Sequence, residues 1–107
     1  MKRAFLASVL LAGCSAEPAI TIDQSGQYAA DVHVQSTPSG IDCGGGASAC
    51  TAEFSSGTTV HLTWTQGSGV PATWFCGIPD CPSTTSSGCD VPMNADVTLL
   101  VGCTEGP

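Results

Sequence analysis

The chain has 107 residues and a formal net charge of −7 at pH 7, from nine acidic and two basic side chains. Both basic residues, Lys2 and Arg3, stand at the N-terminus. The rest of the chain has no lysine or arginine to neutralise phosphate groups, which excludes nucleic acid as a partner and leaves no phosphate-binding cation. The length predicts one small domain with a limited hydrophobic core.

The first segment, MKRAFLASVLLAGC, is typical of an export signal. A basic start precedes an apolar run at 4–12, which is well short of the roughly 20 residues that a membrane-spanning helix needs. Its end, Leu11-Ala12-Gly13-Cys14, resembles the lipobox of bacterial lipoproteins, where the signal is cut before a cysteine whose sulfur carries a diacylglyceryl group. We expect a signal peptide at 1–13 and a lipid on Cys14. The alternative is an ordinary signal followed by a chance cysteine.

The lipid sets the expected location. Two or more acyl chains hold a protein at a membrane, because each buried CH₂ contributes about 0.8 kcal/mol. Ser15, rather than Asp, follows the cysteine, and by resemblance to proteobacterial sorting rules this favours the outer membrane. We expect a bacterial cell-envelope protein with a short tether at 14–19. Whether it faces the periplasm or the cell surface stays open.

Beyond the tether the sequence predicts short strands and turns. A weak strand at 19–23 is followed by an alternating strand at 30–36, with Val32 and Val34 on one face. The clearest strand is 58–65, in which apolar and polar side chains alternate strictly. Its apolar face carries Val60, Leu62 and Trp64, and its polar face carries Thr59, His61, Thr63 and Thr65.

The second half continues this pattern. A short strand at 72–77 contains Trp74, an irregular Pro- and Ser-rich loop is expected at 78–89, and a last strand ends at Cys103. Turns recur at intervals of roughly 8–12 residues, which predicts a small antiparallel all-β domain with a sandwich-like arrangement. The expected core is Val34, Phe54, Val60, Leu62, Trp64 or Trp74, Met93, Val97, Leu99 and Val101.

Six cysteines follow Cys14, and they predict disulfides because their number is even, the domain is small and the compartment is oxidising. No C-x-x-C motif is present and only His61 lies among them, so no metal site is expected. Six cysteines can pair in many ways, and spacing alone does not choose. We expect Cys43 and Cys50 to close a small loop around Gly44-Gly45-Gly46, since glycines allow the φ > 0 turns of a tight ring. The six are Cys43, Cys50, Cys76, Cys81, Cys89 and Cys103.

The order of motifs along residues 20–103 is similar to divergent InlB B-repeat (Listeria–Bacteroides-type) domains of bacterial cell-surface proteins. The matching stretches are STPSGIDCG, a second cysteine, a phenylalanine, SGTTVHLT, a tryptophan, two further cysteines and VPMNADVTLLV. The resemblance implies a compact β module of exported proteins, without known catalytic residues. It also implies that Trp74 belongs to the core.

Two departures from this pattern bear on the disulfides. Cys103 stands where the family's last strand usually has an aromatic residue, and Cys76 is an additional cysteine beside Trp74. Their joint appearance favours a Cys76–Cys103 pair. The full expected set is Cys43–Cys50, Cys81–Cys89 and Cys76–Cys103.

Catalytic and metal sites have little support in the sequence. His33 and His61 lie on polar strand faces, and they would act together only if the sheet made them neighbours. No G-x-S-x-G motif is present, and Asp80, Asp90 and Asp96 lack the spacing of a calcium loop. We therefore expect neither an enzyme nor a cofactor.

The two tryptophans are the candidate binding residues. Trp64 and Trp74 could form a platform for a sugar or a protein, although both also fit the core. The sequence therefore predicts a signal peptide at 1–13, a lipidated tether at 14–19, a disulfide-rich β domain at 20–104 and a tail at 105–107. We expect a monomeric, non-catalytic structural or adhesion-like binding module. The alternative is an inhibitor or immunity-type lipoprotein that blocks an enzyme with its cysteine-bounded loop 76–89.

Overall fold

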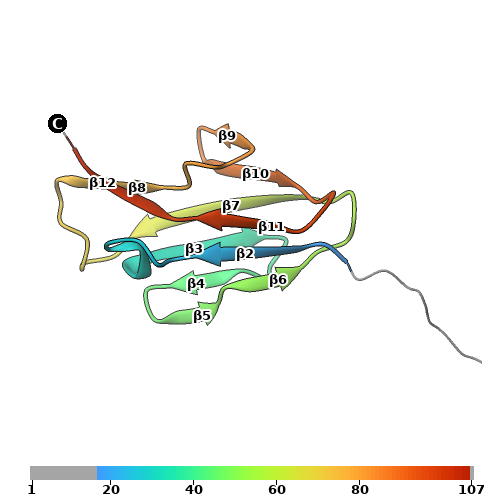
Figure 1. Cartoon of the computed structure of the whole chain (residues 1–107), viewed down its shortest axis with the longest axis horizontal. Helices are drawn as coiled ribbons and strands as arrows, with labels where there is room; N and C mark the ends of the chain where they lie inside the picture. The colour runs from blue at the N-terminus through green and yellow to red at the C-terminus, as the bar shows by residue number, and fades with distance from the viewer. Residues whose placement is uncertain (1–16, 107) are drawn as a thin grey trace, which may run out of the picture.

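The computed structural model describes residues 17–106, which form an all-β domain (Figure 1). The predicted signal peptide and Cys14 lie outside the described residues. A six-stranded sheet has the order β5 (Ala47–Ala49), β4 (Asp42–Gly44), β3 (Val32–Thr37), β7 (Thr59–Gln66), β10 (Gly88–Pro92), β9 (Ser83–Thr85). A three-stranded sheet has the order β11 (Val97–Leu100), β2 (Ala19–Asp23), β6 (Thr51–Glu53), and β12 (Gly102–Glu105) pairs with β8 (Trp74–Gly77).

The strand predicted at 58–65 is the centre of the large sheet. As β7 it pairs antiparallel with β3 on one side and β10 on the other. Its alternation explains this position, because Val60 and Leu62 are fully buried while Thr59, Thr63 and Thr65 are exposed. The predicted all-β, disulfide-containing antiparallel fold is confirmed.

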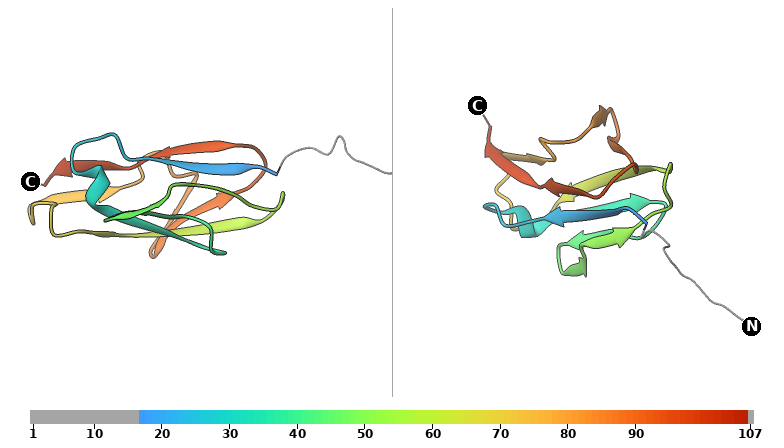
Figure 2. Two further views of the ribbon diagram at one scale, coloured as in Figure 1. Left: turned by 90° about the horizontal axis from the view of Figure 1, so that it is seen from below. Right: turned by 45° about the vertical axis from the view of Figure 1, so that its right-hand side comes forward.

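The three-stranded sheet lies against one face of the large sheet, so the domain is a two-layer sandwich (Figure 2, left). Ile20, Ile22 and Leu99 come from the smaller sheet, and they join Val34 and Leu62 of the larger one in a single buried cluster. Interdigitation of two such apolar faces is the usual way in which sheets form a core. The strands β2 and β11 pair in parallel, whereas the other pairs are antiparallel.

The disulfides join the pairs that were expected: Cys43–Cys50, Cys76–Cys103 and Cys81–Cys89. Cys43 and Cys50 bracket the β4–β5 hairpin, whose glycines at 44, 45 and 46 all have positive φ. Cys43 and Cys89 are fully buried and pack within the core. The part of the chain that the structure describes has no helix long and apolar enough to span a membrane.

Two expectations about the fold are corrected. The segment 78–89 is not an irregular loop, because it contains β9, which forms a hairpin with β10. This strand has only Ser and Thr, so it lacked the apolar alternation that marks a strand. The hairpin with β10 and the Cys81–Cys89 bond hold it instead. Trp64, Trp74 and Val97 are partly buried at the border of the core rather than inside it.

The ends of the domain also differ slightly from expectation. The N–H of Ala19, expected in the tether, donates to Asp96 Oδ1 at 2.9 Å, and the carbonyl of Pro18 accepts from the N–H of Phe54. At the other end, Glu105 is the last residue of β12, and the N–H of Gly106 donates to the carbonyl of Thr73. These backbone bonds extend the folded unit by one or two residues at each end.

Candidate binding groove

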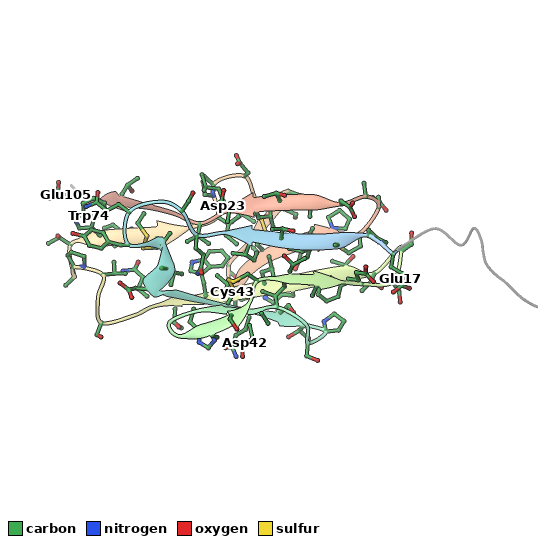
Figure 3. All side chains as sticks on the ribbon, turned by 60° about the horizontal axis from the view of Figure 1, so that its bottom comes forward. Glu17, Asp23, Asp42, Cys43, Trp74 and Glu105 are labelled. Carbon is green, nitrogen blue, oxygen red and sulfur yellow. A yellow bond between two sulfur atoms is a disulfide. The ribbon has the colours of Figure 1, made fainter. Side chains whose placement is uncertain are left out.

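A two-stranded ribbon, β8 and β12, forms one end of the domain (Figure 1). Cys76 and Cys103 face each other across the ribbon, and their disulfide crosses it directly. Figure 3 shows Trp74 and Glu105, from the two strands of the ribbon, at one end of the domain and Glu17 at the other. The ribbon is therefore distant from the point where the chain enters the domain.

The ribbon is attached to the large sheet by side chains of β7. Gln66 Nε2 donates to the carbonyl of Trp74 at 3.0 Å, and its Oε1 accepts from the N–H of Cys76 at 2.8 Å. The indole Nε1–H of Trp64 donates to the carbonyl of Cys76 at 3.2 Å. These bonds give hydrogen-bond partners to backbone N–H and C=O groups on the edge of β8 that faces β7. No backbone ladder joins these two strands.

A groove of about 420 Å³ opens between the ribbon and β9. Phe75 and Trp64 supply its aromatic walls, and Ile78 and Pro79 add apolar surface. Phe75 is 63% exposed, the largest exposed fraction of the large hydrophobic residues in the described chain. Gly77 also lines the groove, and a Cβ at this position would lie 3.7 Å from the Trp64 ring, so glycine leaves the indole accessible. The volume is within the range of small-ligand sites.

A second hollow of about 260 Å³ also borders Trp64. It is lined by the hydroxyl-bearing residues of the β9–β10 turn, while Trp64 and Thr84 border both hollows. The two hollows therefore meet at one indole ring. The residues that line the second hollow are Trp64, Thr84, Thr85, Ser86, Ser87 and Gly88.

The structure separates the two tryptophans that the sequence offered as binding residues. Trp64 lines both hollows, as a binding residue would. Trp74 does not line either of them; its ring packs edge-on against Tyr28 with ring centroids 4.9 Å apart. Phe75 was missed, because in so short a strand the sequence does not reveal which of two adjacent aromatic residues faces outward.

Three side chains beside the second hollow have the connectivity of a serine-hydrolase triad. His61 Nδ1 lies 2.6 Å from Asp90 Oδ1, and His61 Nε2 lies 3.3 Å from Ser87 Oγ. However, the N–H of Ser87, the nearest donor for a developing oxyanion, already bonds Thr85 Oγ1 at 3.2 Å. All three groups are at least partly solvent-exposed. The hydrogen bonds of this cluster join the β9–β10 turn to β7.

The other polar candidates do not converge. His33 bonds Asp42 and stands opposite Thr65, whereas His61 stands opposite Thr37, at the other end of the β3–β7 ladder. Asp96 accepts from the N–H of Ala19 at the start of β2, whereas Asp90 bonds His61, so these two aspartates hold different parts of the fold. Among residues 17–106, no group of three His, Cys, Asp or Glu side chains could hold a metal ion.

The electrostatics of the groove are simple, because no ionisable side chain lines either hollow. Asp23 lies outside both hollows. Hydrogen bonds from the Ser25 side chain and then from its backbone N–H lower the pKa of Asp23 below the usual value for aspartate. The groove therefore offers aromatic, aliphatic and hydroxyl groups without charge.

Comparisons with models of protein families, with curated proteins and with solved structures find no match for this chain.

Proposed function

We propose that this chain is a lipid-anchored cell-envelope module that binds a partner without catalysis, through the groove bordered by Phe75 and Trp64. The observation that carries the proposal is the position of this groove, on the side of the domain that carries the ribbon and away from Glu17, where the described chain begins (Figure 3). The last two residues of β12, at the tip of the ribbon, lie seven and eight residues after the first residue of β11. This separation corresponds to roughly 25 Å along the strands. A domain anchored at Cys14 would present the groove away from the lipid surface.

The rigidity of the groove also supports a binding role. The Cys76–Cys103 bond and the Gln66 side chain fix the ribbon, while the Cys81–Cys89 bond fixes the segment before β9. Walls that are held in place before a partner arrives lose little conformational entropy on binding. The exposed Phe75 side chain contributes little burial energy to folding, and contact with a partner would bury its apolar surface.

The order of motifs that resembles InlB B-repeat domains is consistent with this proposal, since those modules belong to exported surface proteins. The inhibitor interpretation assigns the contact to the segment 76–89 instead. It predicts that binding depends on the exposed residues Asp80 and Pro82 rather than on Phe75. The two interpretations are therefore separated by which substitution abolishes binding.

The anchor is tested by expressing the full chain and its Cys14→Ser variant in an exporting bacterium. We expect the unmodified chain in the membrane fraction, with the added mass of a lipid, and the variant in the soluble fraction. A Cys14→Ser protein that stays bound to membranes would contradict lipidation at this residue.

The binding role is tested with the soluble, oxidised Cys14→Ser chain and isolated envelopes of the bacterium of origin. Co-sedimentation should fall when Phe75→Ala is added. Leu100→Ala is the matched control, because Leu100 is the other exposed large hydrophobic residue, at 38%, and does not line the groove. Equal sedimentation of all three proteins would refute the groove as the binding site.

A further inference from the structure

The chemistry of the groove points to one class of ligand. We propose that the two hollows beside Trp64 bind a neutral saccharide chain; this rests on the proposed function of the groove as a binding site. The aromatic surface, the hydroxyl groups and the charge of the groove each favour such a ligand.

Two aromatic side chains are available to a ligand from different elements. Phe75 comes from β8 and is 63% exposed, while Trp64 comes from β7 and borders both hollows. The indole N–H of Trp64 is bonded to the carbonyl of Cys76, so the ring is held in one orientation. A sugar ring has an apolar face of C–H groups, which packs on such rings.

Hydroxyl groups lie on the same surface. Thr84 and Thr104 line the groove, and Ser86 lines the second hollow. Within residues 17–106 these three hydroxyls make no side-chain hydrogen bond, whereas those of Thr85 and Ser87 bond each other or His61. A purely apolar ligand, such as a lipid chain, would cover such hydroxyls without satisfying them, which is unfavourable. A saccharide can donate to and accept from them.

Charge then selects among saccharides. No ionisable side chain lines the two hollows, and no lysine or arginine follows Arg3 in the sequence. The nine carboxyl groups of the chain repel anions, so uronic acids, sulfated sugars and phosphorylated ligands find no partner. A cationic ligand would find no carboxylate within the groove. The neutral surface fits a neutral sugar chain.

The two hollows share Trp64 and Thr84, which suggests how such a chain would lie. One sugar ring would pack between Phe75 and Trp64, and the next would continue past Trp64 toward Ser86. Because the second hollow is open and polar, it suits a hydrated, hydroxyl-rich unit. The site is therefore expected to prefer an oligosaccharide over a monosaccharide.

The test uses the soluble, oxidised Cys14→Ser chain with four neutral or acidic probes of equal length. These are hexamers of β-1,4-linked glucose, β-1,4-linked N-acetylglucosamine and mannose, and a hexamer of galacturonic acid. Binding is followed by calorimetry and by the chemical shift of the Trp64 indole N–H. We expect at least one neutral hexamer to bind and to shift this resonance, while the galacturonic acid hexamer does not.

Three variants locate the binding. Phe75→Ala should weaken the affinity about tenfold, the usual effect of removing an aromatic side chain that dominates a contact. Gly77→Leu should weaken it comparably by filling the groove, and it keeps the test valid should Phe75→Ala fail to fold. Leu100→Ala should leave it unchanged. Unaltered thermal unfolding of each variant confirms that the domain remains intact.

The outcomes separate this inference from the proposed function. If no neutral hexamer binds, or if the acidic hexamer binds better, the saccharide proposal is wrong. The binding role still stands in that case if envelope sedimentation depends on Phe75 and survives periodate oxidation of envelope sugars. If sedimentation is independent of Phe75, the proposed function itself fails.

Discussion

The side chain of Gln66 bonds the backbone of Cys76 as a neighbouring strand would. In the β8–β12 ribbon, Cys76 and Cys103 have Cα atoms 4.0 Å apart, as in a non-hydrogen-bonded antiparallel pair, so the N–H and C=O of Cys76 point away from β12. Gln66 Oε1 accepts from that N–H at 2.8 Å, and Trp64 Nε1–H donates to that C=O at 3.2 Å. Side chains therefore replace a backbone ladder between β7 and β8.

Replacement of Gln66 tests this connection. Gln66→Ala leaves the N–H of Cys76 and the carbonyl of Trp74 without protein partners, so we expect a loss of about 1–2 kcal/mol in the free energy of unfolding. Hydrogen exchange at the N–H of Cys76 should accelerate more than exchange within β7. Gln35→Ala is the control, because Gln35 is exposed on β3 and forms no side-chain hydrogen bond in the described chain. Equal effects of the two substitutions would contradict the role of Gln66.

The three disulfides should differ in their contributions. In the chain-entropy model, the bond that spans 27 residues, Cys76–Cys103, contributes about 3.5 kcal/mol, and each of the two short ones, with separations of 7 and 8, contributes about 2.5 kcal/mol. Urea unfolding of the paired alanine variants measures these values. Cys76 and Cys103 are only partly buried, so replacing them removes little core packing. The measured loss then reports mainly the loop-closure entropy of the unfolded chain. A loss for the Cys76–Cys103 variant well below about 3.5 kcal/mol would count against the model.

Gly44 is predicted to tolerate no side chain. It has φ +94°, and a Cβ would overlap the carbonyl oxygen of Val32, to which Gln24 Nε2 donates at 2.8 Å. We expect Gly44→Ala to cost about 3–5 kcal/mol or to prevent folding.

Gly46 provides the control for that prediction. It has a similar φ, +98°, but a Cβ at this position would have no atom within 4 Å, so Gly46→Ala should cost only the backbone strain, about 1–2 kcal/mol. Thermal unfolding of both variants compares them. Equal losses would show that backbone strain, and not the contact with Val32, limits Gly44.

Asp23 should give a pH-dependent contribution to stability. Its pKa is lowered in the folded domain by the Ser25 side chain and N–H, so folding favours the charged carboxylate. This contribution is present above the pKa of the unfolded chain, about 4, and disappears as pH falls through the lower folded value. The urea midpoints of the native chain and Asp23→Asn should therefore converge as pH is lowered from 5 toward 2. In Ser25→Ala, NMR titration should place the Asp23 pKa nearer its usual value.

Several features followed from local patterns in the sequence. The alternation in 58–65 determined a strand and its buried face, because strand side chains alternate whatever their neighbours are. The absence of lysine and arginine after Arg3 determined that any site would lack positive charge. The even number of cysteines, together with the expected export signal, predicted disulfides, and the three expected pairs are present.

Other features depend on pairing that no apolar pattern in the sequence specifies, and only the tertiary structure decided them. Strand β9 has no apolar side chain, so its existence depends on pairing with β10. Strands β2 and β11 are adjacent in space but lie at opposite ends of the described chain. Phe75 rather than Trp74 lines the groove because the Cys76–Cys103 pairing fixes the register of the ribbon. A shift of one residue would turn every side chain of the ribbon to the other face, and no local pattern specifies that register.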